Sequence, residues 1–135
     1  MKDATMLQPH TEARASISDV CTKSRQARIR LFNDMFRTRS DKVSLVMGHV
    51  IVTRGIAELP AVFFTAIMEA VRRFDDFTEH NDPHGEHDFG ALTVSGERIF
   101  WKIDYYKRGT EEGSPDPSNM VLTERVLTVM LAEEY

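Results

Sequence analysis

The sequence predicts an α+β fold in which two helices pack on a small, mainly antiparallel sheet of about four strands. Residues 12–37 and 60–77 space their apolar side chains three and four apart, as helices do. Residues 89–106 alternate apolar and polar side chains around a Ser-Gly turn, as a β-hairpin does. The apolar, β-branched run 43–53 is typical of a buried strand.

Length and composition indicate one domain that folds without disulfide cross-links. The 135 residues suffice to bury a core, so we expect a disordered N-terminus over residues 1–11 and a single α+β domain over residues 12–135. Cys21 is the only cysteine, which excludes an internal disulfide. The N-terminus has an acid and a proline where a signal peptide is apolar, and apolar runs fall short of the roughly 20 residues of a membrane span. We therefore expect a cytoplasmic protein that does not enter a membrane.

The net charge of −4 hides a division along the chain. Residues 1–42 hold nine Lys and Arg against five Asp and Glu, and residues 43–135 hold eight against sixteen, which gives +4 and −8. Such asymmetry marks either a nucleic-acid-binding face on the first segment or an acidic face on the rest. The plainer interpretation is a basic exposed helix beside acidic loops.

The first predicted helix runs from Thr11 or Glu12 to about Arg37. Its apolar face is expected to contain Ile17, Val20, Cys21, Ser24, Ala27, Leu31 and Met35. Basic residues cover much of the remainder, so one hypothesis is direct binding of nucleic-acid phosphates, and another is docking to an acidic partner. Phe32 and Phe36 are the only aromatic residues of this helix that could stack on bases, and we interpret both as core contacts.

The apolar run from Val43 to Thr53 predicts a strand that is buried on both faces and bent at Gly48. His49 lies inside this run and is interpreted as a neutral, hydrogen-bonded core histidine. A turn at residues 54–55 is expected to follow.

The second predicted helix begins near Pro60, whose missing N–H has no partner at a first helical position anyway. Its end near Phe77 places Asp75, Asp76 and Glu79 where the helix dipole is negative, so these acids cost stability unless a cation or donor offsets them. The buried face is expected to comprise Phe63, Ile67, Ala70, Val71 and Phe74.

The second strand of the hairpin, residues 97–106, is expected to turn Ile99, Trp101, Ile103 and Tyr105 to one side. Asp104 lies on the other side with Lys102, and a cross-strand ion pair is the simplest account of it. Residues 107–119 predict a mobile loop that serves as a lid or contact surface. Residues 121–135 favour extension, so we predict a final strand there.

One short stretch, residues 74–90, concentrates ionisable side chains beyond what a solvated loop requires. Its three histidines and six carboxylates are His80, His84, His87, Asp75, Asp76, Glu79, Asp82, Glu86 and Asp88. We predict the functional site here. The predicted binding residues are Asp82, His84, Glu86, His87, Asp88, Asp104 and Tyr106.

Metal chemistry is the alternative for this stretch. Imidazole and carboxylate groups bind zinc and manganese, and His84, His87 and Asp88 are the candidate ligands. His84, His87 and Glu86 would then be the catalytic residues of a metal-dependent hydrolase or nuclease; a histidine beside a carboxylate also suits metal-free general acid or base catalysis. The histidines are three apart in a turn, not four apart on a helix as in metalloproteases, and one cysteine excludes a zinc deaminase.

The same residues also have a structural interpretation. Asn81, Asp82 and Pro83 form a turn by composition, and Asp88 can cap backbone N–H groups. Histidines can fix a loop by hydrogen bonding to backbone carbonyls. An architectural or partner-binding role that needs no cofactor is therefore our leading interpretation.

Four segments carry a resemblance to a known family: NDPHGEHDFG (residues 81–90), WKIDYY (101–106), SPDPS (114–118) and RVLTVMLAEEY (125–135). They resemble a family of small bacterial proteins of unknown function, frequent in alphaproteobacteria and on their plasmids and other mobile elements. The similarity covers roughly residues 28–135. Lys107 and Pro115 stand where the family pattern leads us to expect acids.

The resemblance implies a setting and no established activity. Small acidic proteins of mobile elements often bind and block host machinery. By this analogy we expect a non-enzymatic binding protein, such as an inhibitor of the anti-CRISPR or anti-restriction type. Its partner would be a protein or nucleoprotein complex of the host.

Overall fold

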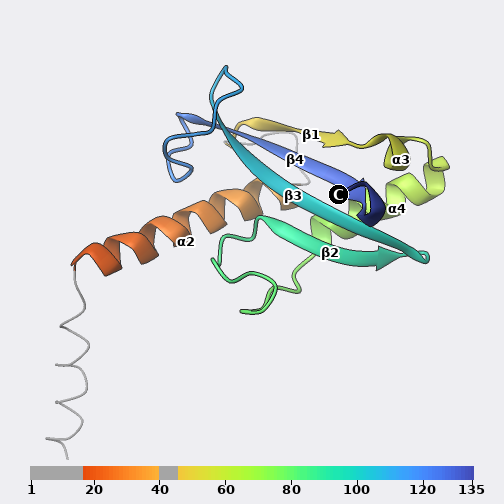
Figure 1. Ribbon diagram of the computed structural model, residues 1–135, viewed down its shortest axis with the longest axis horizontal. Coiled ribbons are helices and arrows are strands. Elements are labelled where there is room, and N and C mark those ends of the chain that lie inside the picture. Colours follow the sequence, from red (N-terminus) through yellow and green to blue (C-terminus); the bar gives the residue numbers. More distant parts are fainter. Residues whose placement is uncertain (1–16, 40–45) are drawn as a thin grey trace, which may run out of the picture.

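The computed structural model describes residues 17–39 and 46–135, and it confirms the predicted α+β class (Figure 1). Its elements are α2 (Ile17–Thr38), β1 (Gly48–Val52), α3 (Arg54–Ala57), α4 (Ala61–Arg73), β2 (Phe89–Val94), β3 (Glu97–Lys107), β4 (Thr123–Leu131) and the 3-10 helix η1 (Ala132–Glu134). The predicted disordered segment, residues 1–11, and the predicted start of the first helix lie outside the described residues.

The four strands form one mixed sheet in the order β1-β4-β3-β2. β3 pairs with β2 and β4 antiparallel, and β1 joins β4 parallel, so the sheet is mainly antiparallel as predicted. Ser95 and Gly96 connect β2 to β3 with φ values of 51° and 85°. Two residues with positive φ match the twist of the paired strands, which explains the tight hairpin.

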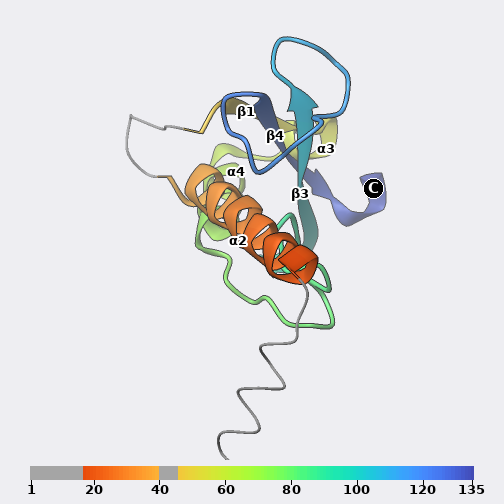
Figure 2. The ribbon, with the colours of Figure 1, turned by 90° about the vertical axis from the view of Figure 1, so that its left-hand side faces the viewer.

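Helix α2 does not bury the face expected of it. Ile17, Val20 and Leu31 are 82%, 59% and 55% exposed, whereas Phe32 and Phe36 are buried, as predicted for those two. The first turns of α2 extend beyond the sheet, and Figure 2 looks onto that projecting end. The 3.6-residue period of the helix was right, but the choice of the core-facing side was wrong.

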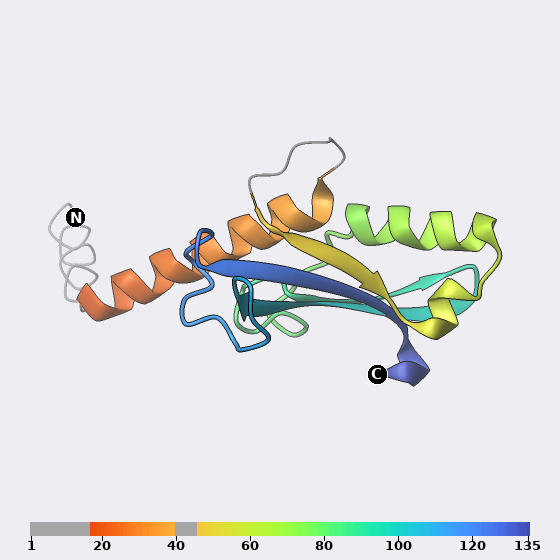
Figure 3. The same cartoon turned by 90° about the horizontal axis from the view of Figure 1, so that it is seen from above.

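Both long helices lie on one side of the sheet, and the C-terminal end of the chain lies on the other (Figure 3). The side of β3 that faces the helices carries Ile99, Trp101, Ile103 and Tyr105, which confirms the predicted alternation. Trp101 is 0% exposed, and the rings of Phe74 and Phe77 meet it edge to face. This layer between helices and sheet is the core.

A strand forms within the predicted range 43–53, at Gly48–Val52, but the prediction that it is buried on both faces was wrong. β1 is an edge strand that pairs only with β4 in the strand order, and its middle residues, His49 to Ile51, are exposed. His49 is therefore not a core histidine, since its side chain is 56% exposed. Position 48 requires a glycine because the backbone of β4 approaches it closely: a Cβ there would lie 2.0 Å from the carbonyl oxygen of Arg125. The first residues of the predicted strand, 43–45, lie outside the described residues.

The second predicted helix is shorter than expected and is preceded by another one. α4 ends at Arg73, and the helical turn α3 replaces the turn expected at residues 54–55. Ile67 and Val71 are buried as predicted, but Phe63 is 41% exposed. Ala70 and Phe74 are half-buried. Because α4 ends early, the acids from Asp75 onward lie past its last turn.

The C-terminal segment is a strand, as predicted, and it ends in η1. Glu134 of η1 accepts hydrogen bonds from the hydroxyl of Thr53 and the backbone N–H groups of Gly55 and Leu131. These bonds tie the end of the chain to the start of α3. No helix within residues 17–39 and 46–135 combines the length and apolar character needed to cross a membrane.

Candidate functional site

The stretch 74–90, predicted as the site, leads from the end of α4 to β2, and His87 attaches it to α2. The Nδ1 atom of His87 lies 2.9 Å from Oδ1 of Asp34, and its Nε2 atom lies 3.6 Å from Oδ2 of Asp82. The imidazole stacks on the ring of Phe77 with centroids 3.7 Å apart and planes 6° apart. Two carboxylates and one aromatic ring therefore fix this histidine between the stretch and the helix.

Asp82 also shapes the backbone of the stretch. Its carboxylate accepts a hydrogen bond from the N–H of His87, which adopts a φ of 56°. Asn81 closes a second turn by accepting a bond from the N–H of Thr78 and donating to the carbonyl of Asp76. These contacts give Asn81 and Asp82 the turn-forming role that their composition indicated.

Glu86 belongs to a polar network between α2 and the sheet. The hydroxyl of Tyr105 donates to Oε1 of Glu86 at 3.0 Å. Nδ2 of Asn33 donates to that hydroxyl at 2.7 Å and to the carbonyl of Glu86 at 2.9 Å. Burial, with the nearby Glu86 charge, raises the pKa of Tyr105, so the phenol stays protonated and can donate.

Arg125 of β4 completes the network and is itself fully buried. Its Nε donates to Oδ1 of Asn33 at 2.6 Å, and its Nη2 donates to the carbonyl of Pro117 at 2.8 Å. The Nη1 atom makes no hydrogen bond within the described part of the chain, and burial lowers the pKa of this guanidinium. Sequence reasoning missed this role, because an arginine in a strand is ordinarily an exposed residue.

A second buried arginine joins the two long helices. Nη1 of Arg37 donates to the carbonyls of Val71 and Arg72, at the C-terminal end of α4 where orphan carbonyls carry partial negative charge. Its guanidinium also lies 4.8 Å from the centre of the Trp101 ring. Burial lowers the pKa of Arg37, and Asp34 opposes that shift.

His84 and Asp88, the other predicted residues of the stretch, have different environments. His84 is exposed, whereas Asp88 is half-buried. Burial and the charge of Glu86 raise the pKa of Asp88. Among the described residues no three His, Cys, Asp or Glu side chains are arranged to hold a metal ion. The zinc or manganese site at His84, His87 and Asp88 and the catalytic role of Glu86 stay predictions.

Asp104 and Tyr106, the last two predicted residues, lie on the opposite side of the sheet. Asp104 forms an ion pair with Lys102 at 2.9 Å, within one strand and not across strands as we expected. This contact raises the pKa of Lys102. The predicted site is therefore divided by the sheet. Glu86 and His87 contact α2, and Asp82 contacts His87, whereas Asp104 and Tyr106 lie on the opposite side of the sheet.

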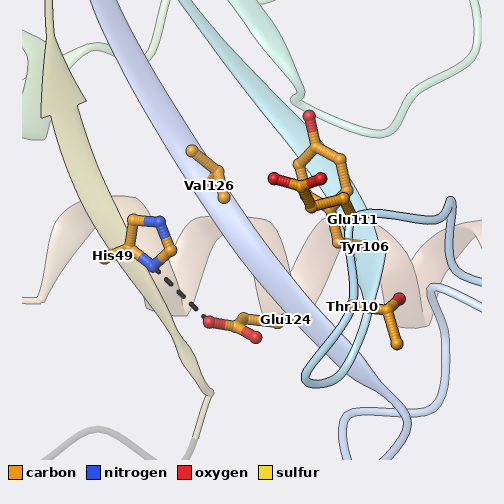
Figure 4. Close-up of a pocket in the computed structure, with 6 residues that line it drawn as sticks. All are labelled: His49, Tyr106, Thr110, Glu111, Glu124 and Val126. Atoms are coloured by element: carbon orange, nitrogen blue, oxygen red, sulfur yellow. Dashed lines mark ion pairs between the residues drawn. The ribbon is translucent and has the colours of Figure 1, made fainter.

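The side of the sheet that carries Tyr106 has a hollow of about 420 Å³ (Figure 4). The residues that line it are His49, Tyr106, Thr110, Glu111, Glu124 and Val126. Nδ1 of His49 lies 3.5 Å from Oε2 of Glu124, across the parallel strand pair. Sequence alternation alone could have placed Glu124 and Val126 on one side of β4, but not the loop residues Thr110 and Glu111 beside them.

An aromatic cluster lies toward the other end of the same side. Phe89 of β2 and Phe100 of β3 are 5.3 Å apart, and Tyr135 meets them at 5.9 and 5.6 Å. Tyr135 remains 75% exposed. We call this side of the sheet, from the hollow to the aromatic cluster, the open face.

Comparison with known proteins finds one family, described as a protein of unknown function (DUF3768), which matches residues 52–134. The chain belongs to the DUF3768 family. This confirms the predicted membership of a family without an assigned function. No curated protein and no solved structure matches the chain.

The DUF3768 region includes most of the open face and excludes α2. Tyr106, Glu111 and Glu124 of the hollow lie within residues 52–134, whereas His49 lies just before them. Asn33, which contacts Tyr105 and Glu86, lies outside the match. The family match therefore covers most of the sheet and the 74–90 stretch, and α2 packs against this region from a segment beyond it.

Proposed function

We propose that this protein is a non-enzymatic binding protein that docks a macromolecular partner on the open face of its sheet. One observation carries the proposal: both long helices pack on one side of the sheet, and the other side presents a polar hollow and an aromatic cluster. Aromatic side chains are enriched at protein interfaces, and in this cluster Phe89 and Phe100 are half-buried while Tyr135 is 75% exposed.

The charge of the open face indicates the chemistry of the partner. Glu111 and Glu124 line the hollow, whereas Asp104, on the same side of β3 as Tyr106, is already paired with Lys102. The two glutamates would receive lysine or arginine side chains, while the rings of Phe89 and Phe100 would contact apolar ones. The hollow and the cluster are about 20 Å apart, six residues along β3. A basic surface with an apolar rim at that spacing fits both.

The biological setting follows from analogy. An acidic protein of a mobile element suits the role of an inhibitor that occupies a basic, nucleic-acid-binding surface of a host defence complex in the cytoplasm. We propose this anti-CRISPR or anti-restriction type of role because Glu111 and Glu124 give the hollow negative charge and the family resemblance points to mobile elements. The partner would then be a protein or nucleoprotein complex.

Capture from host lysate tests this proposal. The purified protein is immobilised, and bound proteins are identified by mass spectrometry for the wild type and for two charge variants. Glu111→Lys/Glu124→Lys reverses the hollow, and Glu79→Lys/Glu97→Lys makes the same charge change at exposed positions elsewhere. Circular dichroism checks that both variants fold.

The expected result is one specific partner that the wild type and the control variant recover and the hollow variant loses. Recovery should fall as salt rises, since the proposed contact is electrostatic. The proposal fails if no specific partner is recovered, or if the hollow variant recovers it as well as the control does.

A further inference from the structure

Helix α2 carries a second apolar stripe on the side that faces away from the sheet. Its members are spaced three and four apart: Ile17, Val20, Ser24, Ala27 and Leu31. Three of them are large and more than half exposed, at 82%, 59% and 55% for Ile17, Val20 and Leu31. The core contacts Phe32 and Phe36 lie on another side of the same helix. The helix therefore has one buried and one exposed apolar face.

Basic residues flank the exposed stripe, and the helical period places Lys23 on one side of it and Arg28 on the other. Other cations of α2 are engaged within the chain. Nε of Arg25 lies 3.1 Å from Oδ1 of Asp116, and Nη1 of Arg30 donates to the carbonyl of Gly85. The outward side of α2 therefore offers apolar side chains with one cation on each margin, Lys23 and Arg28, and with Asp19 one turn before Lys23.

The stripe also borders a hollow of about 380 Å³. Val20, Cys21 and Ser24 line it together with Arg25, Arg28 and Ser118, the last of which belongs to the loop before β4. Ser24 and Ala27 at the middle of the stripe are small, so the backbone of another helix can approach α2 closely. The helix and the loop together therefore form a shallow seat beside the stripe.

We propose that this seat binds an acidic amphipathic helix of a partner protein. From Ile17 to Leu31 the stripe spans about 21 Å, which is two heptads of a facing helix. Leucine-like residues of that helix would cover Val20 and Leu31, and its flanking Glu or Asp residues would meet Lys23 and Arg28. This surface is separate from the open face and does not rest on the function proposed above.

Charge and shape favour this occupant over others. A second copy of α2 would bring Lys23 and Arg28 against the same cations of its partner. A nucleic acid would place phosphates against Val20 and Leu31. A membrane surface favours bulky apolar residues throughout, and here Ser24 and Ala27 occupy the centre.

Two synthetic peptides test the proposal. Both are 21 residues long with leucine at heptad positions a and d; one has glutamate and the other lysine at positions e and g. Fluorescence anisotropy of the labelled peptides measures their binding to the full-length protein at low and high salt. We expect binding of the glutamate peptide that is at least about tenfold tighter than binding of the lysine peptide.

Three variants make the test specific. Val20→Glu/Leu31→Glu should weaken binding of the glutamate peptide by about tenfold or more. Val62→Glu/Val121→Glu, which changes apolar residues exposed by 72% and 66% elsewhere, should not. Lys23→Glu/Arg28→Glu should exchange the preference so that the lysine peptide binds more tightly.

Four results would overturn the proposal. The wild type could fail to bind the glutamate peptide, or the Val20/Leu31 variant could bind it as the Val62/Val121 control does. Analytical ultracentrifugation could find a wild-type dimer that the Val20/Leu31 variant loses, which would make a second copy the occupant. Anionic vesicles or duplex DNA could bind in place of the peptide and depend on the same two residues.

Discussion

Asn33 of α2 accepts a 2.6 Å hydrogen bond from Nε of Arg125 of β4, a residue 92 positions later in the chain. The amide nitrogen of Asn33 donates in turn to Tyr105 and to the backbone of Glu86. One asparagine therefore connects the first helix to two strands and to the 74–90 stretch. Because a buried polar group without a partner costs free energy, this network stabilises one placement of α2 on the sheet.

The network predicts the effect of removing one hydroxyl. Tyr105→Phe leaves Oε1 of Glu86 and Nδ2 of Asn33 each without one hydrogen-bond partner. We expect a loss of about 1–3 kcal/mol in the free energy of unfolding, measured by urea denaturation. Tyr106→Phe removes the neighbouring hydroxyl on the open face and should change stability by less than about 0.5 kcal/mol. Equal effects of the two substitutions would contradict the network.

The contact between Gly90 and Trp101 predicts a steric effect. A Cβ at Gly90 would lie 2.2 Å from Nε1 of the buried indole. Gly90→Ala should therefore destabilise the fold by about 1–3 kcal/mol through overpacking. Trp101 is the only tryptophan, so its fluorescence reports the disturbance directly. Gly113→Ala is the control, because a Cβ at Gly113 would have no described atom within 4 Å, and unchanged stability of Gly90→Ala would refute the contact.

We predict that the contribution of Asp88 to the stability of the fold decreases as the pH rises. Burial raises its pKa above the ordinary value of 3.8, so its ionisation costs more in the folded than in the unfolded chain. This destabilisation is absent below 3.8 and grows until the pH passes the folded pKa. Asp88→Asn should therefore raise the Tm at pH 7 and lose this advantage near about pH 3. A lower Tm of the variant at pH 7 would show that the carboxylate is stabilising.

We predict the opposite pH dependence for the contribution of Glu134 to the stability of the fold. Its pKa lies below the ordinary value of 4.5, first because of the hydroxyl of Thr53 and then because of the N–H groups of Leu131 and Gly55. Its contribution is present above 4.5 and is lost as the pH falls through the folded pKa. Glu134→Gln should lower the Tm at pH 7 and approach the wild type in acid. The substitution Glu133→Gln, at the exposed neighbouring residue, should have little effect on the Tm. An equal loss of Tm in both variants would contradict the role given to Glu134.

The hairpin and the final strand could be predicted because their signals are local. Alternation along residues 97–106 needs only the pleat of one strand, and Ser95-Gly96 needs only two φ angles. The strand β1 was also predicted, but its burial on both faces was wrong, because an apolar run does not specify how many neighbouring strands and helices will cover it. As an edge strand it pairs on one side only and leaves His49 in solvent.

The contacts of the 74–90 stretch could be predicted only in part. The density of ionisable residues in 74–90 identified a stretch that makes many contacts, and Asn81 and Asp82 form the turns their types favour. The partners of the stretch, Asn33 and Asp34, lie about fifty residues earlier, and no pattern within the stretch points to them. The hollow of the open face was missed because it needs three segments to meet.

The sequence by itself determined the α+β class, the hairpin register and the helical period of α2, since each depends on neighbours within a few residues. Only the tertiary structure decided which side of α2 faces the core. It also divided the predicted residues between two sides of the sheet and buried Arg125 between α2 and β4. The physical reason is that a side chain becomes buried only when another element of the fold covers it. A helix with two apolar stripes can bury either, and Phe32 and Phe36 are buried on one while Leu31 stays in solvent on the other.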